Sequence, residues 1–297
     1  MERLSKSPFS LYDFLGYFIP GALFCYLFTV VFDVDEIKWL NLEFFRGLRV
    51  FDQSVAFTLI SYVLGHAINY FSTLTIEQYS IWSIGYPSRY LFGEKPESYF
   101  KKLINKDDEK EKRSHYRSMV WRRGLIVVIL PLWVIDHIIG VKWDFRLHYT
   151  NALDPTLNNL IKCRIEQFKA KHNYNFENGN GDFFRPIWHY YYEKFGTHAV
   201  KLDNYVALYG FTRSMSFIFC FYCWLIFLST IFNGPLWSIY LFSLIPVGII
   251  AIILCTFFSY VFYLAFLKFY RRFTLEGFMC LVIDNDLNDD KVENLKQ

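Results

Sequence analysis

Long apolar stretches lie near both ends of this chain, and a more polar segment separates them. They cover residues 11–32, 55–71, 214–232 and 236–267. The first contains one charged side chain, Asp13, the second contains only His66, and the last two contain neither charge nor histidine. A helix needs about 20 apolar residues to cross a hydrocarbon core. Because backbone polar groups in lipid must be satisfied within the segment, these stretches predict four transmembrane helices.

Charge placement predicts the orientation of these helices. Four spans put both termini on the same side as the segment between spans two and three. Lysine and arginine concentrate there, at Arg3, Lys6, Arg89, Lys95, Lys101, Lys102, Arg213, Lys268, Arg271 and Arg272. By the positive-inside rule, we expect a multi-pass protein of the inner membrane with its termini and residues 80–212 in the cytoplasm.

The pattern also predicts the domain organisation. We expect a transmembrane helix pair in residues 1–79, a cytoplasmic α-helical domain in 80–212, a transmembrane hairpin in 213–272 and an acidic cytoplasmic tail in 273–297. Apolar positions recur at helical spacing in residues 156–172 and 183–209, and no stretch alternates with a period of two. The fold class is therefore an all-α integral membrane protein. The span at 236–267 exceeds the bilayer thickness, and Pro246 is its expected kink.

One further apolar stretch, residues 125–141, leaves two interpretations open. Its uninterrupted apolar part is eleven residues long and ends at Asp136. Arginines precede the stretch at 122 and 123, and Lys142 follows it. A stretch this short is more typical of a buried core helix or a re-entrant piece than of a span. We place it in the core of the middle domain or at the membrane surface.

Composition adds two constraints. The chain of 297 residues is 54% hydrophobic and 21% aromatic, and many aromatic residues fall near the predicted span ends, as in an interfacial belt. Residues 80–212 contain 20 Lys and Arg against 14 Asp and Glu, an excess that suits an anionic leaflet or a polyanionic ligand. Cys220 and Cys223 have zinc-like spacing but lie inside an apolar helix without a second pair, which favours simple packing.

Polar residues within the spans are the first set of candidate functional residues. They are Asp13, Thr58, Ser61, His66, Asn69, Thr256 and Ser259. Polar groups at membrane depth usually face a bundle interior or a water path, so this set could line a pore. In the alternative interpretation Asp13 is a helix N-cap, and His66 and Asn69 make hydrogen bonds between helices. Gly16, Gly21 and Gly65 would allow helices to approach closely.

A second candidate set lies in the middle domain and consists of Asp136, His137, His189, Glu193 and His198. His189 and Glu193 are four residues apart and would share a helix face. An acid–base or metal site is conceivable, although packing of polar groups is the commoner reason for such a pattern. The chain contains no glycine-rich phosphate loop and no G-x-S-x-G or H-E-x-x-H motif. We therefore assign no catalytic, cofactor or metal site and do not expect an enzyme.

Two stretches resemble a known family. Residues 10–22 read SLYDFLGYFIPGA, and residues 191–213 read YYEKFGTHAVKLDNYVALYGFTR. Together they resemble bacterial phage-defence transmembrane effectors of the Hailong type. The resemblance implies an oligomeric, channel-like effector that is held inactive by a partner nucleotidyltransferase or its nucleic-acid product. Opening on infection would dissipate the membrane potential.

These observations lead to one principal functional hypothesis and two alternatives. The principal hypothesis is a homo-oligomeric pore in the lipid bilayer, with a tetramer as one candidate state. It would be gated through its cytoplasmic domain by a nucleotidyltransferase partner or by a nucleic-acid or nucleotide ligand. The alternatives are a membrane-bound enzyme that uses the second candidate set and a non-catalytic membrane anchor or scaffold.

Overall fold

The protein is all-helical in a computed structural model. The structure describes residues 13–31, 50–94, 109–172, 182–194, 196–231 and 245–284. About 90% of it is helical, and these residues form no strand, which confirms the predicted all-α class. The chain divides into two compact units. The first unit comprises residues 1–79, 103–146 and 207–266, and the second comprises residues 80–102, 147–206 and 267–297.

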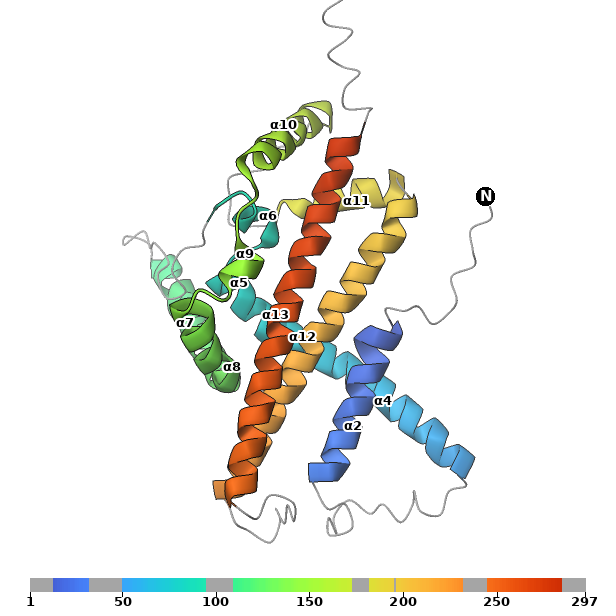
Figure 1. The fold of residues 1–297 in the computed structure, drawn as a ribbon, viewed down its shortest axis with the longest axis vertical. Helices are drawn as coiled ribbons and strands as arrows, with labels where there is room; N and C mark the ends of the chain where they lie inside the picture. The colour runs from blue at the N-terminus through green and yellow to red at the C-terminus, as the bar shows by residue number, and fades with distance from the viewer. Residues whose placement is uncertain are drawn as a thin grey trace, which may run out of the picture. The chain divides into compact units, whose positions relative to one another are not determined.

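The first unit contains most of the apolar helices (Figure 1). The π-helix η1 (Phe14–Phe18) leads into α2 (Ile19–Val31). Helix α4 (Val50–Ser72) continues through a second π-helix, η2 (Thr73–Glu77), into α5 (Gln78–Ser83). The unit also contains α7 (Glu109–Val128), α8 (Leu130–Ile135) and the π-helix η3 (Asp136–Lys142), together with parts of two longer helices within residues 207–266. Because π-helical turns are rare and concentrate at functional sites, these three segments locate the regions of interest.

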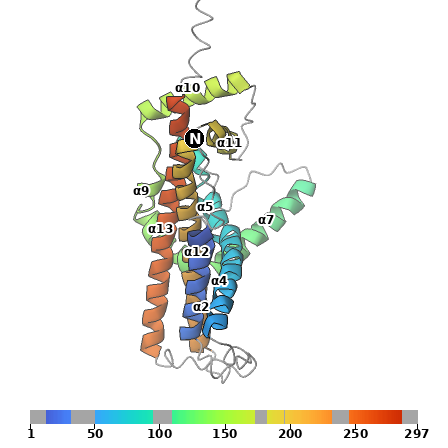
Figure 2. The same cartoon turned by 90° about the vertical axis from the view of Figure 1, so that its right-hand side faces the viewer.

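Helices α12 (Gly196–Ile231) and α13 (Ile245–Ile283) are the two longest and run side by side (Figures 1 and 2). Their 36 and 39 residues correspond to about 54 and 59 Å, well beyond a hydrocarbon core of about 30 Å. Pro246 is the second residue of α13, where its missing N–H costs no helical hydrogen bond. The kink that we expect at Pro246 would involve residues 236–244, which lie outside the described part.

The second unit contains α6 (Pro87–Tyr90), α9 (Leu147–Thr150), α10 (Pro155–His172) and α11 (Phe184–Lys194). The predicted helices at 156–172 and 183–209 are confirmed, the latter with its expected restart at Gly196. The N-terminus of α10 is capped by Asp154, whose Oδ2 accepts a hydrogen bond of 3.0 Å from the backbone N–H of Thr156. Phe168, Phe184, Ile187 and Tyr191 are fully or almost fully buried in this unit.

Helices that could cross a membrane are confirmed, although their number is not fixed at four. Within the described part of the chain, three helices are long and apolar enough by length and composition: Gln53–Tyr90, Val200–Ile231 and Gly248–Ile283. A fourth candidate is the pair Ser118–Val128 and Leu130–Lys142, which is bent by 89° and is here called the bent pair. The predicted first span, residues 11–32, contains a shorter apolar helix, Phe14–Phe28.

The compact units are each made of segments that are not consecutive in the sequence. Residues 103–146, which include the apolar stretch at 125–141, group with the apolar helices of the first unit rather than with residues 80–102 and 147–206. Residues 273–283, which we expected to begin an acidic tail, continue α13. The middle of the sequence therefore contributes to both units. The bent pair, which lies within it, has an apolar surface and groups with the apolar helices of the first unit.

Candidate functional site in the first unit

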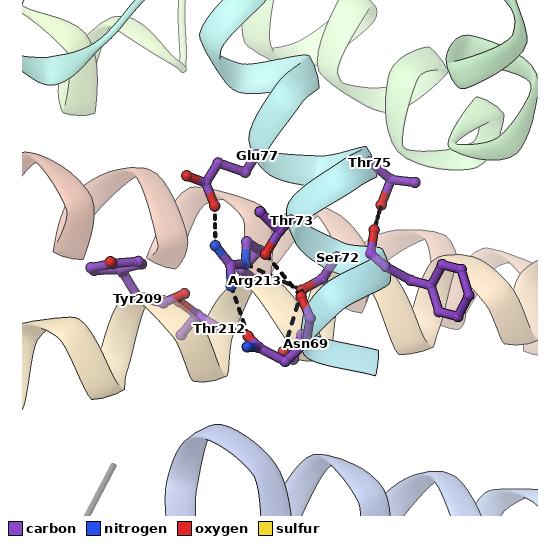
Figure 3. Close-up of polar contacts among 10 residues, drawn as sticks. Asn69, Ser72, Thr73, Thr75, Glu77, Tyr209, Thr212 and Arg213 are labelled. Carbon is purple, nitrogen blue, oxygen red and sulfur yellow. Dashed lines mark hydrogen bonds and ion pairs between the residues drawn. The ribbon is translucent and has the colours of Figure 1, made fainter. Parts of the chain in front are cut away.

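A buried guanidinium group belongs to a network of polar contacts in the first unit (Figure 3). Arg213 lies on α12 directly before the uncharged run 214–232, and its side chain is 7% exposed. Its Nη1 donates to Glu77 Oε2, its Nη2 donates to Asn69 Oδ1 over 2.7 Å, and its Nε donates to Ser72 Oγ over 3.2 Å. These four residues are here called the Arg213 cluster. The guanidinium thus has partners on all three of its nitrogens.

The π-helix η2 gives α4 the geometry that this cluster needs. The hydroxyl groups of Ser72 and Thr73 both donate to the backbone oxygen of Asn69, over 2.8 and 2.9 Å, and Thr75 donates to the oxygen of Phe71 over 2.7 Å. Hydroxyl donors of this kind compete with backbone N–H groups for the same carbonyls. Three of them in four residues loosen the α-helical hydrogen bonding, which accounts for the wider π-turn that precedes α5 (Figure 3).

A buried carboxylate forms a second polar cluster. Asp136, at the start of η3, is completely buried. Its Oδ2 accepts hydrogen bonds from Tyr79 Oη over 2.7 Å and from Arg146 Nη1 over 3.0 Å, whereas its Oδ1 has no hydrogen-bond partner. Burial lowers the pKa of Arg146, but the Asp136 carboxylate together with Tyr263 and Tyr79 raises it by more, so this pKa lies above its ordinary value. Asp136, Tyr79 and Arg146 are here called the Asp136 cluster.

The predicted residues Ser259 and Thr256 on α13 pair with α12. Ser216 Oγ donates to the backbone oxygen of Ser259 over 2.9 Å, and Ser259 Oγ donates to that of Ser216 over 2.9 Å. Thr256 Oγ1 lies 3.3 Å from Cys223 Sγ. These contacts hold two apolar helices in register.

The predicted polar residues at the crossing of α2 and α4 also contact each other. The His66 ring stacks on Tyr17 with 3.8 Å between centroids and meets the edge of Tyr62 at 4.7 Å. Ser61 is fully buried, and its Oγ lies 3.9 Å from Cys25 Sγ. Of the two remaining positions, Thr58 donates a hydrogen bond of 2.8 Å from its Oγ1 to the backbone oxygen of Ser54, and Asp13 makes no capping hydrogen bond with its side chain.

The second candidate set is not brought together. Asp136 and His137 belong to the first unit, where His137 stacks on Trp133 at 5.5 Å. His189 and Glu193 belong to the second unit, where His189 contacts the ring of Trp188 at 4.3 Å and Glu193 is exposed. The side chain of His198 lies outside the described residues. The described residues contain no group of three or more His, Cys, Asp or Glu that could hold a metal ion.

The second unit has a buried polar cluster of its own. Asp284 accepts a hydrogen bond of 2.9 Å from Tyr191 Oη and lies 2.7 Å from Lys194 Nζ. Burial and the neighbouring carboxylate raise the pKa of Tyr191 well above its ordinary value of 10.0. The three side chains satisfy one another, so this cluster fixes the end of α13 against α11.

Sequence reasoning found Asn69 and Asp136 but missed most of their partners. No sequence motif marks Glu77, Tyr79, Arg146 or Asp284, and Arg213 contributes only to the charge pattern that predicts orientation. One usable signal was present. Arg213 directly borders an uncharged run, and Glu77 is the first acidic residue after the second apolar stretch. A cation and an anion that border two predicted spans on the same side of the membrane are expected to pair.

Comparisons with protein-family models, with curated proteins and with solved structures gave no match to this chain.

Proposed function

We propose that this chain is the subunit of a homo-oligomeric membrane pore. In this pore, α4 faces an aqueous path and contacts the neighbouring copies. The observation that carries the proposal is a comparison of the candidate spans: the span with the most polar sequence is also the span that is least buried. Of the three candidate spans in the described residues, Gln53–Tyr90 is the least apolar. Only 17% of its most apolar stretch of 18 residues is buried, against 28% and 50% for the corresponding stretches of the other two.

Lipid exposure alone would favour the opposite order. A helix surface in contact with hydrocarbon should be at least as apolar as a surface buried between helices, because polar side chains at membrane depth are costly. The exposed positions of α4 include Gln53, Ser54, Thr58 and His66 among apolar neighbours. Contacts with other copies around a water-filled path would cover these positions.

The Arg213 cluster supports a gating role for the end of this helix. It links α4 and η2 to α12 through a buried ion pair. Such a pair is stable only while both partners keep their positions, so a displacement of α12 would act on α4 directly. In the proposal, ligand or partner binding to the basic cytoplasmic region supplies this displacement. The resemblance to phage-defence effectors adds a context in which the open pore depolarises the membrane.

Ion flux through the full-length protein in liposomes tests the proposal. Thr58→Cys on α4 and Ile250→Cys on α13 are a matched pair, since both positions are exposed in helices of the first unit. A hydrophilic thiol reagent should alter the flux through Thr58→Cys and leave Ile250→Cys unchanged. A protein that never conducts, with or without candidate nucleotide and nucleic-acid ligands, would contradict the pore. The reverse labelling pattern would contradict the assignment of α4.

A further inference from the structure

The bend of the bent pair lies against the apolar part of α12. The backbone oxygen of Val128 accepts a hydrogen bond of 2.9 Å from Trp224 Nε1 and lies 3.7 Å from Cys220 Sγ. Pro131, in the first turn of α8, has no N–H to donate to the turn before it. Carbonyl groups at such a break need a protein donor if no water is near, and Trp224 supplies one.

These contacts place the bend at the depth of a candidate span. Cys220 and Trp224 both lie within the uncharged run 214–232 of α12. A carbonyl that is within hydrogen-bonding distance of Trp224 Nε1 shares the depth of that residue. The bend of residues 118–142 is therefore level with the interior of α12 and not with its charged border at Arg213.

The arm after the bend returns toward the Arg213 end of α12. A Cβ atom at Gly140 would lie 3.2 Å from Tyr260 Oη, and the neighbouring Ser259 exchanges hydrogen bonds with Ser216. Ser216 precedes Trp224 by eight residues, or about 12 Å along the helix. The chain therefore travels back along α12 between Val128 and Gly140.

Several apolar side chains around the bend are partly exposed. Val127, Val128, Leu130 and Val134 are each between 38% and 59% exposed. Exposed polar side chains lie farther along the two arms, at Arg123 and His137. This order, apolar at the bend and polar toward the ends, is the order expected of an element whose tip is in hydrocarbon and whose ends reach the interface.

We propose that residues 118–142 form a re-entrant element, which enters the bilayer from the Arg213 side and returns to the same side. Lipid acyl chains cover the apolar surface around its bend. The alternative for a bent helix pair is a broken span, in which Lys142 would reach the opposite side of the membrane. This inference requires that α12 spans a membrane, but it does not require that the protein conducts ions.

Depth measurements on the full-length protein test the proposal. Single cysteines are introduced at Val127 and Val134 near the bend and at Arg123 and Trp143 on the arms, in a background without the native cysteines. Each carries an environment-sensitive fluorophore in liposomes of phosphatidylcholine and phosphatidylglycerol. We expect nitroxides on lipid acyl chains to quench the labels of Val127→Cys and Val134→Cys more strongly than nitroxides on lipid headgroups do. Aqueous iodide should not quench these two labels. The labels of Arg123→Cys and Trp143→Cys should show the opposite preference.

The remaining outcomes each overturn a defined part of the proposal. Strong iodide quenching at Val127→Cys and Val134→Cys would place the bend in water. Labelling of Arg123→Cys and Trp143→Cys from opposite sides of the membrane would establish a broken span. Disulfide formation between copies at Val134→Cys would show that protein and not lipid covers this surface. Hydrogen exchange of the unmodified protein in nanodiscs serves as a check without variants, since fast exchange at residues 125–132 would contradict membrane insertion.

Discussion

Arg213 is held by three partners that all belong to one stretch of the chain, Asn69 to Glu77. Because of this arrangement, the stability of the protein is sensitive to the loss of either charge of the ion pair. A buried cation with its anion is close to neutral for stability, whereas either charge alone in the same place is strongly unfavourable. The contribution of the cluster is therefore visible only when one partner is removed.

The first prediction compares single and double substitutions in this cluster. Arg213→Met leaves Glu77 without its cation and should lower the free energy of unfolding by about 3 kcal/mol. Adding Glu77→Met should recover a large part of that loss. The exposed Lys268→Met is the control and should have little effect. Unfolding in mixed detergent micelles measures all four proteins, and equal losses in the single and double variants would contradict the buried ion pair.

The second prediction concerns pH. Below about pH 10 Tyr191 is neutral in both the folded and the unfolded protein. Above that pH the unfolded chain releases the proton, but the folded protein retains it because the pKa of Tyr191 is raised. Stability should therefore fall as the pH rises above 10. Tyr191→Phe should make this decline shallower, as measured by the free energy of unfolding between pH 8 and about 11. An identical slope in both proteins would contradict the raised pKa.

At the scale of elements, the crossing of α2 and α4 depends on two glycines. A Cβ atom at Gly21 would overlap the backbone oxygen of Ser61, and one at Gly65 would overlap that of Tyr17. The two helices thus touch backbone to backbone. Such a contact leaves no flexible side chain that could move aside, so the helices themselves would have to separate.

The third prediction follows from this contact. Gly21→Ala should destabilise the protein by several kcal/mol and expose Cys25, which lies beside Ser61, to thiol reagents. Gly124→Ala is the matched control, because nothing lies within 4 Å of the added methyl group on α7. Alanine should be neutral there or stabilising by up to about 1 kcal/mol. Equal behaviour of the two variants would mean that α2 and α4 do not cross at Gly21.

How far the sequence predicts these elements depends on the range of the interaction. Apolar runs predicted helices such as α12, because that signal is local. The partners of Arg213 could not be predicted in this way, since Glu77 and Asn69 lie 136 and 144 residues away along the chain. Residues 125–141 likewise make contacts that are distant along the chain, such as that of Val128 with Trp224, and they group with the first unit.

At the scale of the whole molecule, the proposed pore determines which positions of neighbouring copies lie close together. If α4 faces a symmetry axis, equivalent positions on its exposed N-terminal half approach each other in the assembly. Exposed positions on the lipid-facing side of α13 stay apart. The two helices therefore differ in how readily cysteines from separate copies meet, and this difference does not depend on whether the pore is open.

The fourth prediction uses that difference. Ser54→Cys on α4 should form disulfide-linked dimers in native membranes under a mild oxidant, and Ile253→Cys on α13, which is 61% exposed, should not. Linked dimers should persist when the protein is diluted in excess lipid before oxidation, because copies of a stable assembly do not separate. Cross-linking that falls with dilution would indicate random collision. Efficient cross-linking at Ile253→Cys with none at Ser54→Cys would place α13, rather than α4, between the copies and would require a different pore-lining helix.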